Sequence, residues 1–271
     1  VERGVGRGDG KRHARRGQQR QLPVVGERFD DRRELLKQLD ALKVGLDSRD
    51  ADKGFDQFDK QAAELISTGA GKAFDISNEK KEVLERYDTS KFKCGKKVFE
   101  PSILGKQFLM ARRLIEAGCG FVTVQSAGWD MHADGNNPNV KDGMAMLGAP
   151  LDKGLSAFLE DLEQRGLSEK VLVIVTGDFG RTPKINPRTG RDHWPRVFSA
   201  ALAGGGVKGG QVIGRSSADG MAIDSDPVQV SDLLTSICHS MQVDPRTENI
   251  SPLGRPVKIV DGGTVIPKLF G

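Results

Sequence analysis

The amino-acid sequence predicts an α/β fold with a mostly parallel central sheet, and two patterns carry this prediction. Residues 171–176 are an uninterrupted run of β-branched and aliphatic side chains, which is typical of a strand buried on both faces of a parallel sheet. An amphipathic segment at 105–117 ends at Gly118, and a strand-like run, 120–126, follows almost at once. A helix joined to a strand by so short a link is the rhythm of α/β proteins.

The other expected elements follow the same logic. Leu104, Phe108, Ala111 and Ile115 recur at helical spacing and define the inner face of the helix at 105–117. Residues 150–164 predict another helix with Pro150 in its first turn, where no N–H is needed. Further elements are expected as a short helix at 78–87, a strand at 197–202, a helix at 227–241 capped by Ser225 or Asp226, and an edge strand at 257–260.

The chain divides by composition into three parts. Residues 1–26 are rich in Gly and Arg without periodicity, which favours a disordered or non-native basic leader over a nucleic-acid-binding arm. Residues 27–100 predict a helical cap or insertion, because leucines recur at helical spacing from Leu35 to Leu46. Residues 101–271 carry the α/β pattern and form the main domain.

Composition excludes several classes of protein. The net charge of +4 comes largely from the first twenty residues, so no basic face indicates nucleic acid. No apolar run reaches the length of about 18 residues that a membrane span needs, and no signal peptide is expected, because the basic N-terminal residues lack an apolar segment. The three cysteines contain no CxxC pair, and Cys119 and Cys238 are expected to be buried thiols. His239 lies in a predicted helix without neighbouring ligands and is interpreted as structural.

The candidate metal-binding residues lie in two predicted loops. Asp130 and His132 follow the strand-like run at 120–126, and Asp178 follows the strand at 171–176. His193 comes from the far end of the same second loop, which is long enough to fold back on itself. Imidazole and carboxylate are the groups that Zn²⁺ prefers, and sites form at the carboxyl ends of strands. These four residues are therefore predicted metal ligands.

Other residues near these loops have two readings each. Arg181 and Arg191 offer guanidinium forks that match phosphate or sulfate oxygens, but Arg181 could instead order the loop by pairing with Asp178. Trp129 and Trp194 each neighbour a predicted ligand and either wall the site or pin the loops by packing. The glycine cluster at 204–210 lacks the spacing of a phosphate-binding loop and is interpreted as a turn.

Several motifs together resemble a known bacterial family. They are Gly-Trp-Asp-Met-His at 128–132, Gly-Asp-Phe-Gly-Arg-Thr-Pro at 177–183, Gly-Arg-Asp-His-Trp-Pro at 190–195, the glycine-rich 204–214 and Met-Ala-Arg-Arg-Leu-Ile-Glu-Ala-Gly at 110–118. From about Arg28 onward the chain resembles the domain of unknown function 1501 family, a branch of the alkaline phosphatase/sulfatase-like superfamily. The resemblance implies a three-layer α/β/α fold, one or two divalent metals, and an exported or periplasmic location.

The sequence departs from that family at two places. Members usually carry Glu at the position of Asp178, and a shorter carboxylate stands here. The family's N-terminal portion, with its first strand, a metal-binding Asp and a Ser or Thr nucleophile, has no counterpart before Arg28. The resemblance therefore implies an incomplete member, with part of the sheet missing, no identifiable nucleophile, and no activity of this chain alone.

Two functions from different classes remain. The first is a metal-dependent hydrolase of the phosphatase or sulfatase type, which acts on a small anionic ester or a sulfated or phosphorylated polymer. Asp130, His132, Asp178 and His193 would bind the metal, with zinc expected first and calcium, magnesium or manganese as alternatives. Arg181 and Arg191 would hold the substrate. The second is a non-catalytic envelope or interaction protein that retains the fold.

Overall fold

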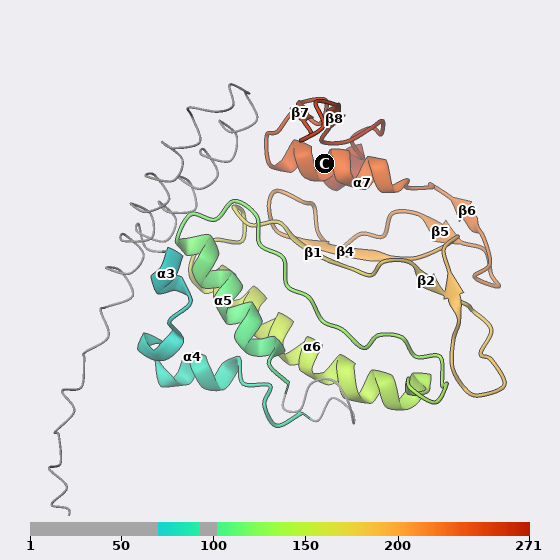
Figure 1. The fold of residues 1–271 in the computed structure, drawn as a ribbon, viewed down its shortest axis with the longest axis horizontal. Coiled ribbons are helices and arrows are strands. Elements are labelled where there is room, and N and C mark those ends of the chain that lie inside the picture. Colours follow the sequence, from blue (N-terminus) through green and yellow to red (C-terminus); the bar gives the residue numbers. More distant parts are fainter. Residues whose placement is uncertain (1–69, 93–101) are drawn as a thin grey trace, which may run out of the picture. The chain divides into compact units, whose positions relative to one another are not determined.

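The computed structural model describes residues 70–92 and 102–271. The chain divides into two units, residues 1–56 and 57–271, and every described residue belongs to the second. The helix expected around Leu35–Leu46 lies outside the described residues. The described helices are α3 Ala70–Ala73, η1 Ile76–Asn78, α4 Lys81–Arg86, α5 Leu104–Glu116, α6 Val140–Gln164, α7 Val230–Ser240 and η2 Pro267–Leu269 (Figure 1).

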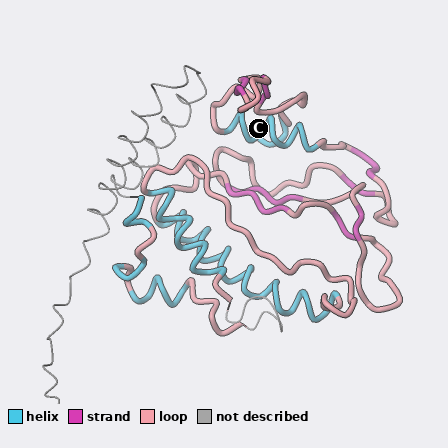
Figure 2. Tube along the Cα trace, viewed as in Figure 1, coloured by secondary structure: helices cyan, strands magenta, loops and turns pink. Residues whose placement is uncertain are grey.

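The strands are short and pair only in twos within this part of the chain. They are β1 Val173–Thr176, β2 Gly180–Arg181, β3 His193–Trp194, β4 Ala200–Ala203, β5 Arg215–Ser216, β6 Ile223–Ser225, β7 Glu248–Ile250 and β8 Pro256–Lys258. β1 pairs with β4, β2 with β3, β5 with β6 and β7 with β8, and every pair is antiparallel. Long stretches between them are loop (Figure 2).

The predicted three-layer α/β/α fold with a mostly parallel central sheet is therefore wrong for this structure. A parallel crossover usually carries a helix, whereas residues 177–199 contain only the β2–β3 hairpin, so the chain returns to β1 in the antiparallel direction. β1 is also not buried on both faces, because none of its residues is fully buried. The expected strand at 120–126 is an extended loop whose Val122 and Val124 pack against the helical core.

The core of the described region lies between helices. α5 and α6 run side by side, and α4 contacts α6 (Figure 1). Leu104, Phe108 and Ala111 are buried on α5 as the sequence spacing predicted. Phe108 stacks at a tilt on Phe158 of α6, with ring centroids 5.6 Å apart. Such aromatic contacts add to the burial energy of the apolar surface.

A buried ion cluster crosses this helical layer. The Arg112 side chain is 2% exposed and lies 2.9 Å from Glu79, 2.6 Å from Glu116 and 3.0 Å from Asp161. Although burial alone would lower the pKa of Arg112, the carboxylates of Glu79 and Glu116 raise it above its ordinary value. The Tyr87 hydroxyl donates to Asp161 at 3.1 Å, and burial followed by the charge of Asp161 raises the pKa of Tyr87. The cluster joins the residues that flank α4 to α5 and α6.

Helix boundaries differ from expectation at two places. α6 begins at Val140, ten residues earlier than expected, because Asn139 caps it by accepting from the Asp142 backbone at 2.9 Å. Pro150 therefore lies inside α6 and is fully buried there. α7 begins at Val230 and is capped by Gln229 rather than by Ser225 or Asp226. Among the described residues, no helix is long and apolar enough to cross a membrane.

Candidate functional site

The first loop is anchored to α6 by Met131. This side chain is 6% exposed and packs with Leu147, Trp129 and Val140. Gly143 on α6 makes room for it, because a Cβ there would lie 2.6 Å from the Met131 side chain. Burial of an unbranched apolar side chain at this point fixes the loop against the helix. Asp130 and His132, on either side of Met131, are then presented away from that packing.

The second loop folds back as a hairpin. In the pairing of β2 with β3, Gly180 lies opposite Trp194 and Arg181 lies opposite His193. Directly opposed residues in an antiparallel pair share one face. The Phe179 ring lies 4.4 Å from the His193 ring, and the Arg181 guanidinium lies 5.0 Å from the Phe179 ring centroid. The hairpin thus delivers an arginine and a histidine side by side.

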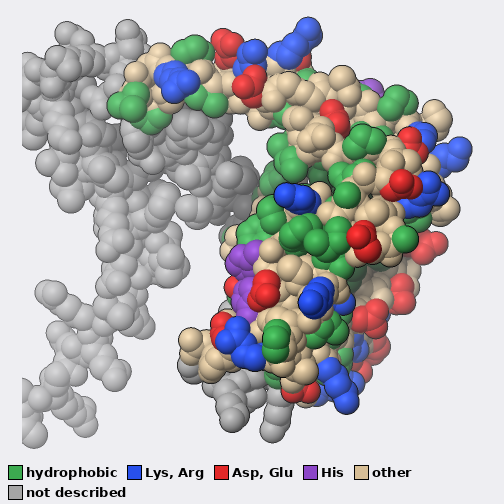
Figure 3. Space-filling model, turned by 90° about the vertical axis from the view of Figure 1, so that its right-hand side faces the viewer, with side chains coloured by type: hydrophobic (Ala, Val, Ile, Leu, Met, Phe, Trp, Pro, Cys, Tyr) green, Lys and Arg blue, Asp and Glu red, His purple; other side chains and the backbone are tan. Residues whose placement is uncertain are grey.

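The two loops meet at three side chains. His132 Nε2 and His193 Nε2 are 2.9 Å apart, and Asp130 Oδ1 lies 3.4 Å from the first and 3.3 Å from the second. These three are the described His, Cys, Asp or Glu residues whose ligand atoms group closely enough to hold one ion. The side chains of His132, His193 and Asp130 are 18%, 49% and 51% exposed, so solvent reaches the triangle. Figure 3 shows a group of histidine side chains at the surface beside acidic ones.

The triangle fits a divalent ion in size and donor type. A point equidistant from the three atoms lies about 1.9 Å from each, close to the bond lengths of about 2.0–2.2 Å between zinc and imidazole or carboxylate. Two imidazole nitrogens and one carboxylate oxygen are a common set for catalytic zinc. With neutral imidazoles, Asp130, Asp178 and Asp192 outweigh the positive charge of Arg181 around the site, so a divalent cation would balance the local charge.

The fourth predicted ligand is placed apart from this triangle. The Asp178 carboxylate accepts from the Phe179 backbone N–H at 2.9 Å and lies 3.9 Å from Arg181 Nη1. Its side chain is 66% exposed. The structure thus brings Asp130, His132 and His193 together and leaves Asp178 at the edge of the site.

The two predicted anion-binding arginines differ in their contacts. Arg181 Nη2 donates to Asp130 Oδ1 at 2.9 Å, so it lies directly beside the triangle. Arg191 Nη1 donates to the carbonyls of Thr182 at 2.7 Å and Pro183 at 3.0 Å, inside its own loop. Arg181 is therefore the arginine beside the ligand group, and Arg191 holds the hairpin loop closed.

The tryptophans pack rather than line a cleft between these loops. Trp129 contacts the Met131 cluster, and its Nε1 donates to Ser126 Oγ at 3.0 Å. Trp194 is half-buried, and the Arg196 guanidinium lies 5.3 Å from its ring centroid. Both contacts fix loop segments next to the ligands, which is the packing alternative for these residues.

Sequence reasoning missed three residues at this site. Asp192 Oδ1 lies 3.6 Å from His132 Nδ1, Asn186 Nδ2 donates to the His132 carbonyl at 3.1 Å, and Phe179 contacts the His193 ring. Their only signal in the sequence was proximity to the predicted ligands, since Asp192 directly precedes His193 and Phe179 follows Asp178. The hairpin register decides which of several neighbouring polar residues contacts a predicted ligand. Proximity in the sequence does not contain that information.

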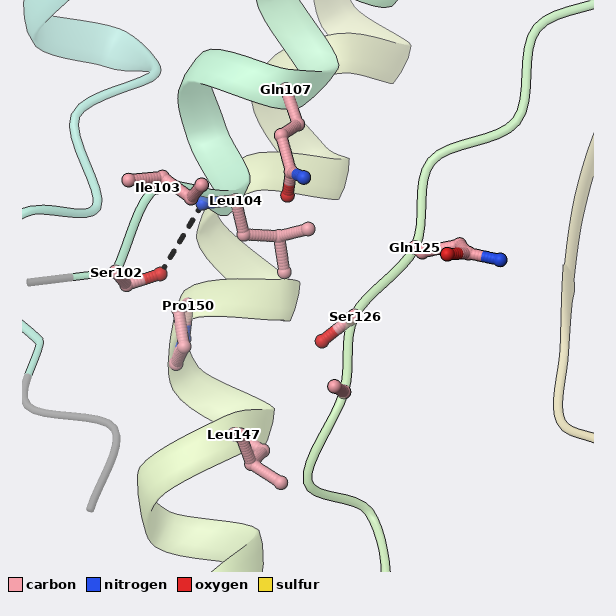
Figure 4. Close-up of a pocket in the computed structure, with 9 residues that line it drawn as sticks. Ser102, Ile103, Leu104, Gln107, Gln125, Ser126, Leu147 and Pro150 are labelled. Atoms are coloured by element: carbon pink, nitrogen blue, oxygen red, sulfur yellow. Dashed lines mark hydrogen bonds between the residues drawn. The ribbon is translucent and has the colours of Figure 1, made fainter. Parts of the chain in front are cut away.

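A small cavity of about 40 Å³ lies elsewhere, between the start of α5, the middle of α6 and the extended loop at 125–127. Figure 4 shows Leu104, Leu147 and Pro150 lining it, with Ser126 on the loop side. It contains none of the predicted ligands or anion-binding residues. The candidate site is therefore the open triangle on the surface, separate from this cavity.

Comparison with known proteins gives one relationship. Residues 7–270 match the family described as Protein of unknown function (DUF1501). The match begins before Arg28, the residue from which the motif resemblance runs. It includes all the candidate site residues. No curated protein and no solved structure matches the chain. Because the family match covers nearly the whole sequence, the chain belongs to the DUF1501 family.

Proposed function

We propose that this protein is a metal-dependent hydrolase of the phosphatase or sulfatase type that acts on an anionic phosphate or sulfate ester, by relationship to the alkaline phosphatase/sulfatase-like superfamily. The observation that supports it is the triangle of His132 Nε2, His193 Nε2 and Asp130 Oδ1, at mutual distances of 2.9, 3.4 and 3.3 Å. Zinc is the metal that suits this donor set best.

The residues of the site have distinct roles in this proposal. Asp130, His132 and His193 hold the metal, which would polarise the ester oxygen and activate a water molecule. Arg181 binds the anionic group, because its guanidinium lies beside Asp130 and has further N–H donors than the one it uses there. Phe179 supports Arg181 through its ring face and keeps water from that side of His193.

One observation favours a second candidate, a non-catalytic metal-binding interaction protein. In the described part of the chain, no Ser or Thr hydroxyl is hydrogen-bonded to Asp130, His132 or His193. A hydroxyl nucleophile is normally held by a base or a metal at such a site. Hydrolysis would then depend on water as the acceptor, and a site that binds metal without positioning a water would be inactive.

Metal binding and turnover separate these candidates. The full chain is loaded with zinc, calcium, magnesium or manganese, metal content is measured by mass spectrometry, and chromogenic aryl phosphate and aryl sulfate are assayed. We expect one zinc per chain, lost in His132→Gln and His193→Gln and retained in His239→Gln. His239 is the matched control because it lies on α7 with its ring against Phe270. Arg181→Met is expected to keep the zinc and raise KM.

The outcomes are distinct. Zinc binding with turnover that His132→Gln and His193→Gln abolish supports the hydrolase. Stoichiometric zinc without turnover on either ester supports the interaction protein and refutes the hydrolase for this chain. Absence of bound metal in the wild-type protein under all four loading conditions refutes both forms of the proposal.

A further inference from the structure

We propose that Asp192 is a positioning residue that fixes the tautomer of His132, so that His132 presents a free Nε2 lone pair to the ligand triangle. This inference rests on the proposed metal site and deepens it. It assigns different roles to the two histidines. His132 already has the tautomer that binds a metal through Nε2, whereas His193 must change its tautomer before its Nε2 can bind.

The two ring nitrogens of His132 face different neighbours. Nε2 points into the triangle, 2.9 Å from His193 Nε2 and 3.4 Å from Asp130 Oδ1. Nδ1 lies 3.6 Å from Asp192 Oδ1 on the other side of the ring. An ionised carboxylate only accepts hydrogen bonds, so Asp192 favours the proton on Nδ1 and Asp130 favours it on Nε2. Asp130 Oδ1 already accepts from Arg181 Nη2 at 2.9 Å and lies 3.3 Å from His193 Nε2, so two other donors satisfy it and Asp192 decides the tautomer of His132. A contact of 3.6 Å is longer than a hydrogen bond, and a shift of about 0.5 Å would close it.

Asp192 is itself held in place from several directions. Its Oδ1 accepts from Asn186 Nδ2 at 3.2 Å, and its backbone N–H donates to Thr182 Oγ1 at 3.1 Å. Its carbonyl accepts from the Thr182 backbone N–H at 2.8 Å. The backbone of Asp192 is thus held at two points and its carboxylate at one, by Asn186, which limits the rotation of the carboxylate beside His132.

Asn186 links this carboxylate to the backbone of the histidine it orients. The same Nδ2 that contacts Asp192 also donates to the His132 carbonyl at 3.1 Å, and Asn186 Oδ1 accepts from the Gly190 backbone N–H at 2.9 Å. The Asn186 side chain therefore fixes the position of the Asp192 carboxylate relative to His132. Histidine ligands in metal sites commonly have such a carboxylate partner, and removing it typically lowers metal affinity by about 10–100-fold.

The tautomer of His132 also determines where the proton of His193 lies. With the proton of His132 on Nδ1, the 2.9 Å contact between the two Nε2 atoms needs its hydrogen from His193. In the metal-free protein His193 Nε2–H therefore donates to His132 Nε2, and Asp130 Oδ1, 3.3 Å from the same nitrogen, is a second acceptor. For both Nε2 atoms to bind a metal, the proton on His193 Nε2 must leave that nitrogen, and the ring's own Nδ1 can take up a proton from solvent in exchange. His193 is the more exposed ring, which suits this exchange.

Nitrogen-15 imidazole spectra of the metal-free full chain test the tautomers directly. The chain has four histidines, and His13→Gln, His193→Gln and His239→Gln identify three of the signals, which leaves the fourth as that of His132. We expect His132 to carry its proton on Nδ1 in the wild type and to shift toward the Nε2–H form in Asp192→Asn. Asp134→Asn is the matched control, since it removes a charge two residues from His132 that is paired with Asn136 and Asn137 instead. It should leave the spectrum unchanged.

Zinc titration supplies the second readout. We expect Asp192→Asn to weaken zinc binding by about 10–100-fold, Asp192→Glu to recover part of this loss, and Asp134→Asn to change it less than about twofold. An unchanged His132 tautomer in Asp192→Asn overturns the inference. So does a loss of zinc as complete as in His132→Gln, because Asp192 would then be a ligand itself. The tautomer result stands even if the wild type binds no metal, which would refute the proposed function alone.

Discussion

The close approach of the two loops can be tested at Gly190. A Cβ at this position would lie 2.2 Å from both the carbonyl carbon and oxygen of His132, and 2.7 Å from the Met131 carbonyl oxygen. These are backbone atoms, so they cannot rotate away as a side chain would. Reaching a normal contact of about 3.5 Å requires the loops to separate by more than about 1 Å in Gly190→Ala.

That separation breaks two hydrogen bonds between the loops. The Arg191 backbone N–H donates to the Met131 carbonyl at 2.9 Å, and Asn186 Nδ2 donates to the His132 carbonyl at 3.1 Å. Each contributes about 0.5–1.5 kcal/mol, and overpacking adds about 1–3 kcal/mol where the structure yields only in part. We therefore expect Gly190→Ala to destabilise the folded state by about 2–6 kcal/mol.

The assay combines thermal unfolding with zinc titration. Gly190→Ala should lower Tm by about 4–24 °C, at about 2–4 °C per kcal/mol for a chain of this size, and should weaken zinc binding because His132 moves away from His193. Gly135→Ala is the control, since the same first loop leaves a Cβ there with no atom within 4 Å. If both variants share the Tm and zinc affinity of the wild type, the two loops do not approach as described.

Three further predictions concern the helical layer and the site. Arg112→Met should destabilise the protein by about 3 kcal/mol in chemical denaturation, because buried carboxylates lose their partner, whereas the exposed Lys81→Met should cost less than about 0.5 kcal/mol. Burial opposes ionisation of Glu79, but Arg112 outweighs it, so the pKa of Glu79 lies below its ordinary value of 4.5. The stability that Glu79 contributes is thus present above that value and lost as pH falls below it, and the difference in unfolding free energy between wild type and Glu79→Gln should shrink between about pH 6 and about pH 3. Zinc should slow hydrogen exchange at the amides of Arg191 and Thr182, which bond across the two loops and the hairpin, while amides of the β7–β8 hairpin exchange unchanged; equal slowing at both would indicate global stabilisation only.

Helices were predictable from the sequence where one apolar stripe decided the packing. Leu104, Phe108 and Ala111 are buried on α5 at the expected spacing. The first ten residues of α6 were missed because Gly143 and Gly148 weaken helix propensity and Pro150 resembles a first-turn proline. The Asn139 cap and the burial of the inner face of α6 outweigh the effects of the glycines and the proline. The burial depends on tertiary packing, which a short-range sequence pattern does not contain.

The sheet was not predictable from the same kind of pattern. An uninterrupted apolar run such as Val173–Val175 suits any strand with apolar neighbours on both sides, and periodicity does not say how many strands flank it. Here one face of β1 packs against the helical core and one edge pairs with β4. The predicted parallel partner at 120–126 contributes only its alternate valines to the same core, as an extended loop.

The composition of the site follows from hairpin register rather than from the edge of a large sheet. Because Arg181 lies opposite His193, both side chains share a face and both reach Asp130 Oδ1, at 2.9 and 3.3 Å. Residues one step before or after this pair face elsewhere, so Asp192 meets the back of His132 instead of the triangle. Asp178 precedes the hairpin and is not carried to that face by the pairing. A count of acids and histidines near strand ends could therefore select three side chains that the structure brings together and a fourth, Asp178, that it places at the edge of the site.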